Sequence, residues 1–245
     1  MVQFKLDGTN LGAEVIAAPY VTLWNTTLGA SGTHVLGAVA RNAAGNIGTA
    51  VPVSVTVDNA PPSVSITAPA SGATVTGSIT VSATATDDVR VVGVQFTLDG
   101  TNLGAEVIAA PYTTLLKTTL IASGTHVLSA VARDGAGNIG TAAPVSVTVD
   151  NFPPSVSITV PVPGATVAGT ITVAASATDS VGVVGVQFKV DGMYLGPELS
   201  TGPYAISWNT ASVPNGFHTL TAVARDIAGN TSTSSAVTVR VRNHR

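Results

Sequence analysis

The sequence predicts an all-β chain of tandem antiparallel β-sandwich modules, about seven strands to a module, with the first module truncated at its N-terminus. Two observations predict this class. The 245-residue chain repeats itself every 92 residues. Within each repeat, apolar and polar residues alternate, as they do along strands that bury one face. Helical spacing of apolar residues is not sustained over three turns in any window.

The repeat defines the domain organisation. Residues 2–57 match residues 94–149 at 47 of 56 positions without a gap, and His34, His126 and His218 keep the same spacing. A period of 92 exceeds the roughly 20–50 residues of solenoid units and suits a small β-sandwich of about 100 residues. We therefore expect a partial module at 1–59 and complete modules at 60–151 and 152–245.

The first module lacks a counterpart of residues 60–92, because Met1 aligns with Gly93. Two interpretations are open. The chain is a piece of a longer array, or the truncation is natural and another chain supplies the missing strands. The second interpretation predicts homotypic assembly through the first module, since an open sandwich leaves sheet edges unpaired and core residues uncovered.

Alternation marks the strands of the second module in order. Asp99-Gly100 follows one of them, and Asp-Gly after an alternating run indicates a tight hairpin because glycine accepts positive φ. Short strands with regularly spaced turns are typical of an immunoglobulin-like sandwich. The expected strands are Val64–Thr67, Ile79–Ala85, Val94–Leu98, Tyr112–Leu116, His126–Arg133 and Val145–Val149.

Composition excludes several function classes. Charged residues make up only 9% of the chain, and three lysines with a net charge of −3 leave no basic surface for nucleic acid. No segment is long and apolar enough for a membrane helix, so we expect no membrane insertion. The absence of cysteine excludes disulfides, thiolate metal sites and thiol nucleophiles.

The chain contains the segments PPSVSITAPASGATVTGSITVSATATDD, VGVQFTLDGTNLG, APY, SGTHVLSAVARDGAGN and the closing VSVTVD. Together these segments resemble the bacterial Ig-like domains of secreted and surface proteins. The resemblance implies an extracellular or cell-surface location. It also implies a non-catalytic role, because such modules typically separate catalytic, carbohydrate-binding or adhesive parts of long proteins.

The residues themselves also predict that the chain is not an enzyme. The three repeated histidines occur once per module, at the start of a strand, where we expect them to hydrogen-bond a loop backbone. The only glutamates, Glu14, Glu106 and Glu198, also occur once per copy, so no module offers a glutamate pair for glycoside hydrolysis. Trp24 and Trp208 are expected in the core, because copy two has Leu116 at the matching position.

Acidic and amide side chains gather in loops that an immunoglobulin-like sandwich brings to the end where the chain enters the module. Their oxygens are hard ligands of the kind that Ca²⁺ collects in sets of six to eight. An Asx turn explains any one of them without an ion. The candidate interdomain calcium ligands are Asp58, Asn59, Asp87, Asp88 and Asp134 at one module and Asp150, Asn151, Asp179 and Asp226 at the next.

The sequence therefore predicts a spacer or stalk segment of a bacterial surface or secreted protein, whose partners are the neighbouring modules of the same array. One alternative is a filament or adhesin subunit joined by strand complementation or by contact with a glycan. Another alternative is the accessory region of a polysaccharide-active enzyme. Proline pairs such as Pro153-Pro154 restrict backbone torsions in the linkers and favour extended connections.

Overall fold

The computed structural model describes residues 1–243, and its regular structure is β-strand apart from three short 3₁₀ turns. The predicted all-β class is confirmed. The last two residues of the predicted third module, 244 and 245, lie outside the described residues. The described helical segments, each a single turn, are all too short to cross a membrane.

The chain divides into two compact units. One contains residues 1–70, 80–115 and 127–145, and the other contains residues 71–79, 116–126 and those from 146 onward. The 92-residue copies remain the natural way to compare equivalent strands, because each strand of one copy has a counterpart 92 residues along the chain.

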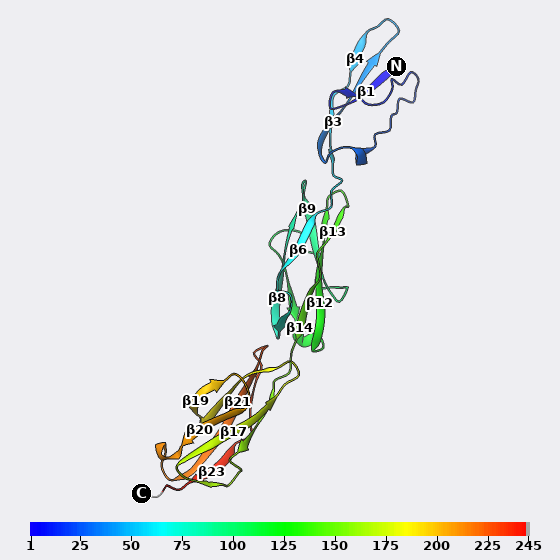
Figure 1. The fold of residues 1–245 in the computed structure, drawn as a ribbon. Helices are drawn as coiled ribbons and strands as arrows, with labels where there is room; N and C mark the ends of the chain where they lie inside the picture. Colours follow the sequence, from blue (N-terminus) through cyan, green and yellow to red (C-terminus); the bar gives the residue numbers. More distant parts are fainter. Residues whose placement is uncertain (244–245) are drawn as a thin grey trace. The chain divides into compact units, whose positions relative to one another are not determined.

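The first copy forms one five-stranded sheet in the order β2-β1-β3-β4, with β5 pairing β3 as well (Figure 1). The long strand β3 pairs antiparallel with β1, so that Phe4 lies opposite Ala38. The elements are β1 (Val2–Leu6), β2 (Thr9–Asn10), η1 (Thr26–Leu28), β3 (Gly32–Arg41), β4 (Ile47–Thr49) and β5 (Val53–Val57).

The second copy contributes a sheet ordered β10-β9-β12-β14-β7, in which β13 also pairs β12, and a sheet ordered β11-β8-β6. Its elements are β6 (Ser63–Ala68), β7 (Ala73–Val75), β8 (Ser78–Thr86), β9 (Val91–Leu98), β10 (Thr101–Asn102), β11 (Tyr112–Lys117), η2 (Thr118–Leu120), β12 (Gly124–Asp134), β13 (Ile139–Thr141) and β14 (Val145–Val149).

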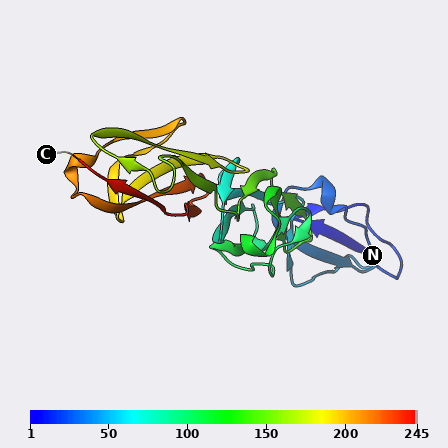
Figure 2. The same cartoon turned by 90° about the horizontal axis from the view of Figure 1, so that it is seen from below.

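The third copy repeats this plan with sheets ordered β15-β17-β20 and β16-β23-β21-β18-β19, and β22 pairs β21 (Figures 1 and 2, yellow-green to red). Strand β16 runs parallel to β23, and the other pairings are antiparallel. Its elements are β15 (Ser155–Val160), β16 (Thr166–Val167), β17 (Thr170–Thr178), β18 (Val183–Val190), β19 (Met193–Leu199), β20 (Tyr204–Asn209), η3 (Thr210–Ser212), β21 (Gly216–Asp226), β22 (Thr231–Thr233) and β23 (Val237–Val241).

Alternate residues of these strands form the core of the third copy. Phe188, Leu220 and Val239 are fully buried and come from three neighbouring strands of the larger sheet. Trp208 and Val173, from the smaller sheet, belong to the same apolar cluster. The cluster explains the period-two pattern of the sequence, because only one face of each strand is buried.

The Asp-Gly turns form the predicted hairpins. Asp7, Asp99 and Asp191 have φ near +50°, and the glycine that follows each has φ near +80°. Two successive positive φ values match the turn that follows strand twist in a two-residue hairpin. Glycine and aspartate are among the residues that accept this backbone at low cost.

One segment adopts different structure at equivalent positions of different copies. Residues 112–117 and 204–209 form β11 and β20, which pair with β8 and β17. The matching residues of the first copy, 20–25, form no strand, because no counterpart of β8 is present among the described residues to pair with them. A strand requires a neighbour for its backbone hydrogen bonds, so local sequence is not sufficient here.

Candidate functional site

Three aspartates meet where the chain enters the third copy. Asp150 follows β14, Asp179 follows β17, and Asp226 ends β21. One carboxylate oxygen from each lies within 4.8 Å of the other two. We refer to these three residues as the Asp150 cluster, and the sequence predicted all three as candidate ligands.

Two members of the Asp150 cluster are held by their own loops. Oδ1 of Asp179 accepts hydrogen bonds from the backbone N–H groups of Val181 (2.8 Å) and Gly182 (2.9 Å). The two oxygens of Asp226 accept one bond each from Asn230, from its backbone N–H and from its Nδ2. These bonds fix the carboxylates in place and leave each oxygen with further accepting capacity.

Asp150 is different, because it is fully buried and poorly satisfied. Its Oδ1 accepts one long bond, 3.4 Å from the backbone N–H of Phe152, and its Oδ2 is buried with no hydrogen-bond partner. Burial raises the pKa of the Asp150 carboxyl, and the negative charges of Asp179 and Asp226 raise it further. The Asp150 carboxylate is therefore the member of the cluster whose charge protein donors compensate least.

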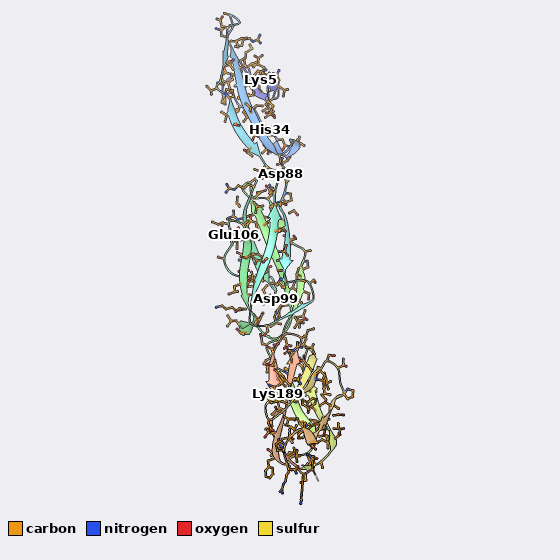
Figure 3. All side chains as sticks on the ribbon, turned by 90° about the vertical axis from the view of Figure 1, so that its left-hand side faces the viewer. Lys5, His34, Asp88, Asp99, Glu106 and Lys189 are labelled. Carbon is orange, nitrogen blue, oxygen red and sulfur yellow. The ribbon has the colours of Figure 1, made fainter. Side chains whose placement is uncertain are left out.

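A related group lies where the chain enters the second copy, formed by Asp58, Asp87 and Asp88, whose carboxylate oxygens also lie within 4.8 Å of one another. We call it the Asp58 cluster. Oδ2 of Asp87 accepts bonds from the backbone N–H groups of Val89 and Arg90, and its Oδ1 has no partner. Burial raises the pKa of Asp58, with smaller contributions from the neighbouring aspartates. Figure 3 labels Asp88 at one end of this copy and Asp99 at the other.

Asp134 does not join the Asp58 cluster, although its loop position matches that of Asp226. Its Oδ1 accepts three backbone bonds, from Ala136, Gly137 and Asn138, and its Oδ2 accepts a 2.7 Å bond from Asn138 Nδ2. Burial raises the pKa of Asp134, but these hydrogen bonds outweigh burial and lower the pKa overall. The carboxylate is therefore satisfied within its own loop.

The side-chain nitrogens of Asn59 and Asn151 bind carbonyl groups outside the two clusters. Nδ2 of Asn59 donates to the carbonyl of Thr26 (2.8 Å), and Nδ2 of Asn151 donates to the carbonyl of Thr118 (2.9 Å). Both asparagines therefore bind the 3₁₀ turns η1 and η2. Their side-chain nitrogens satisfy turn carbonyls, a task that an aspartate cannot perform.

Asn138 and Asn230 were not among the predicted ligands, although both contact the entering chain. Nδ2 of Asn230 donates to the carbonyl of Asp150 (2.9 Å), and Nδ2 of Asn138 donates to the carbonyl of Asp58 (3.1 Å). Each asparagine thus connects the Asp of its own loop to the backbone of the entering chain. The 92-residue spacing of the two asparagines was the signal in the sequence that could have identified them.

A repeated pair of histidine and aspartate side chains holds the hairpin turns in place. In the third copy, His218 Nδ1 lies 2.6 Å from Asp191 Oδ2, and His218 Nε2 lies 2.8 Å from the carbonyl oxygen of Pro214. Both neighbours are acceptors, whereas a neutral imidazole has a single N–H. The two bonds together require the protonated ring, and the bond to Asp191 is the main cause that raises the pKa of His218. His34 repeats the arrangement with Asp7 and Ala30.

The first copy presents its core face uncovered. Val53 is 57% exposed, whereas its counterpart Val237 is 6% exposed. Phe4 and Trp24 are partly exposed, whereas Phe188 and Trp208 are buried. Phe4, Trp24 and Val53 line an apolar hollow of about 350 Å³.

Comparison with known families identifies the repeat. The model of a family described as bacterial Ig domain matches residues 62–130 and 154–222, which together exceed half of the chain. The chain belongs to the bacterial Ig domain family. The two matches begin 92 residues apart, in agreement with the period of the sequence. Tandem domains of this kind are typical of extracellular spacer or adhesin-type proteins, and bacterial Ig domains are typically extracellular or on the cell surface.

Comparison with solved structures gives several matches. The fibronectin(III)-like modules of CbhA from Clostridium thermocellum are 26% identical, over 74% of this chain and 94% of that chain, with a TM-score of 0.49. The endo-beta-1,4-mannanase from Thermotoga petrophila is 21% identical over 39% of this bacterial Ig chain, which covers 21% of the mannanase, with a TM-score of 0.34. A 1.5-MDa bacterial ice-binding adhesin is 18% identical over 99% of this chain and 86% of that chain, with a TM-score of 0.42. Comparison with curated proteins gives no significant match.

The His218–Asp191 pair predicts how the stability of this bacterial Ig domain depends on pH. Because the folded-state pKa of His218 is raised, its contribution is complete below the unfolded pKa of about 6.5 and is lost as pH rises through the folded value. Urea unfolding between pH 5.5 and 8.5 should show a larger loss of stability for the wild type than for His218→Gln. Parallel pH profiles for the two proteins would contradict this assignment.

Proposed function

We propose that the chain is a non-enzymatic spacer segment of a bacterial surface or secreted protein, which holds functional parts of that protein apart. The observation that carries this proposal is which groups the repeated polar side chains contact. The histidine–aspartate and arginine–glutamate pairs that recur every 92 residues bond to each other within their own copy, so they maintain the module.

The arginine and glutamate pairs illustrate this use. Arg133 binds Glu106 through two bonds, of 2.6 and 2.9 Å, and Arg41–Glu14 and Arg225–Glu198 repeat the pair at 3.1 and 3.2 Å. Gly185 leaves the room for Glu198, because a Cβ at that position would collide with the glutamate carboxylate. A glycine 92 residues earlier, Gly93, does the same for Glu106.

The chain between successive repeats is also restrained, which supports a spacer. The backbone N–H of Asp150 donates to the carbonyl oxygen of Val75 at 3.0 Å, and the carbonyl oxygen of Asp150 accepts from Asn230 Nδ2 at 2.9 Å. Pro153 and Pro154 follow within a few residues and fix two φ angles. Few torsions of this short segment remain free.

If the array is a spacer, the function of the parent protein should depend on the length of the array and not on the chemistry of its surface. In the parent protein, deletion of one 92-residue period should reduce the function of the parts that the array separates, such as adhesion of cells to a surface. Replacement of that period by an unrelated Ig-like module of equal size should restore the function. Failure of the unrelated module, with the original repeat restoring activity, would contradict the proposal.

A second candidate function is self-association by strand complementation, and the uncovered core face of the first copy favours it. The occupant that fits this face is a segment with the pattern of residues 60–92, because β15 and β17, at the matching positions of the third copy, pack against the core there. Partly exposed Phe4 and Trp24 would then be covered as their counterparts are.

Fusion of a copy of residues 60–92 in front of Met1 tests this candidate. Sedimentation should show that the mass of the present chain rises with concentration and that the fused chain stays monomeric, because the graft fills the face intramolecularly. A control graft carrying aspartate at the position of fully buried Val81 should not prevent association. A chain that is monomeric without any graft would exclude strand complementation and leave the spacer proposal intact.

A further inference from the structure

We propose that the Asp150 cluster binds one hard divalent cation, with Ca²⁺ as the cation to test. The proposal goes beyond the spacer function and does not depend on it. It stands on two separate observations, the mutual distances of the three carboxylates and the buried oxygen of Asp150 that has no hydrogen-bond partner.

The distances fit a common ion. Two oxygens bound to one Ca²⁺ at 2.3–2.6 Å can be at most about 5 Å apart. The ligand atoms of Asp150, Asp179 and Asp226 all lie within 4.8 Å of one another. Three carboxylates supply part of the six to eight oxygens that Ca²⁺ prefers, and water completes such a shell in proteins.

The buried oxygen points to a ligand beyond the protein. Asp150 is 0% exposed, and its Oδ2 is shielded from water without accepting any hydrogen bond. Burial of a carboxylate without a partner is costly, and two further carboxylates beside it add repulsion. A cation removes both penalties at once, whereas an Asx turn explains only Oδ1, which accepts from Phe152.

Comparison with the second copy shows why the Asp150 cluster is the stronger site. Arg90 lies in the same loop as the Asp58 cluster and lines a surface hollow with Asp58, so a cationic side chain is available there. The third copy has Gly182 at the position of Arg90, and Ser180 at the position of exposed Asp88. The Asp150 cluster is more buried than the Asp58 cluster and has no arginine at the position of Arg90.

A bound ion would join three segments that are distant in sequence. Asp150 lies on the chain that enters the third copy, Asp179 in the loop after β17, and Asp226 at the end of β21. The ion would add to the bond from Asn230 to the carbonyl of Asp150. Loss of the ion would leave that segment held by hydrogen bonds alone.

Calorimetric titration of the full chain with Ca²⁺, after treatment with EDTA and dialysis, tests the proposal. The wild type should show a binding event that Asp150→Asn and Asp226→Asn each weaken at least about tenfold, because each removes a charged ligand. Added Ca²⁺ should also raise the melting temperature of the wild type and have a much smaller effect on the two variants.

Matched substitutions in the second copy provide the controls. Asp134→Asn changes the same loop position as Asp226→Asn in a residue of similar burial, so damage to loop hydrogen bonds is common to both. It should leave the Asp150-dependent event within about twofold of wild type. Any event that Asp150→Asn leaves unchanged belongs to another site, such as the Asp58 cluster. If Asp150→Asn weakens no binding event, or if the wild type binds no Ca²⁺, the proposal is overturned.

Discussion

Burial of one apolar face of a sheet against a second sheet is the interaction on which the rest of the structure depends. In the third copy, Phe188 and Leu220 from one sheet share a core with Val173 and Trp208 from the other. The first copy keeps nearly the same residues in its larger sheet but has no second sheet among residues 1–243, and Val53 there is mostly exposed. Residues 20–25 also fail to form a strand, because pairing and burial are gained together.

The polar residues are arranged around this core and depend on it. Hairpins place Asp191 beside His218, and the ends of strands β17 and β21 bring Asp179 and Asp226 to the entering chain at Asp150. The first arrangement is complete, since every acceptor has a donor when the imidazole is protonated. The second is incomplete, since Asp150 Oδ2 has no hydrogen-bond partner. That difference separates a polar group that maintains the fold from one that points to a ligand.

Much of this could be predicted from the sequence, and the exceptions have physical causes. The 92-residue period and the alternation along β12 and β18 can be recognised in a single sequence. Strand geometry is enough to interpret them. The Asp-rich loops were predicted to converge, and they do for Asp150, Asp179 and Asp226. Asn59 and Asn151 could not be placed in advance, because an amide can both donate and accept, and nearby turn carbonyls competed for them. Likewise, the spacing of residues in the sequence does not reveal that the loop of Asp134 supplies the hydrogen bonds that its carboxylate needs.

Hydrogen exchange of the full chain, resolved by residue, tests the role of the second sheet most directly when Phe4→Ala is compared with Phe188→Ala. The two phenylalanines occupy the same position of the repeat and differ in whether an opposing sheet buries them. The account predicts that Phe188→Ala lowers the opening free energy of β18 and β21 by about 3–5 kcal/mol. Phe4→Ala should lower that of β1 and β3 by less than about half as much, because its ring is already partly exposed. Equal losses at the two positions would contradict the account.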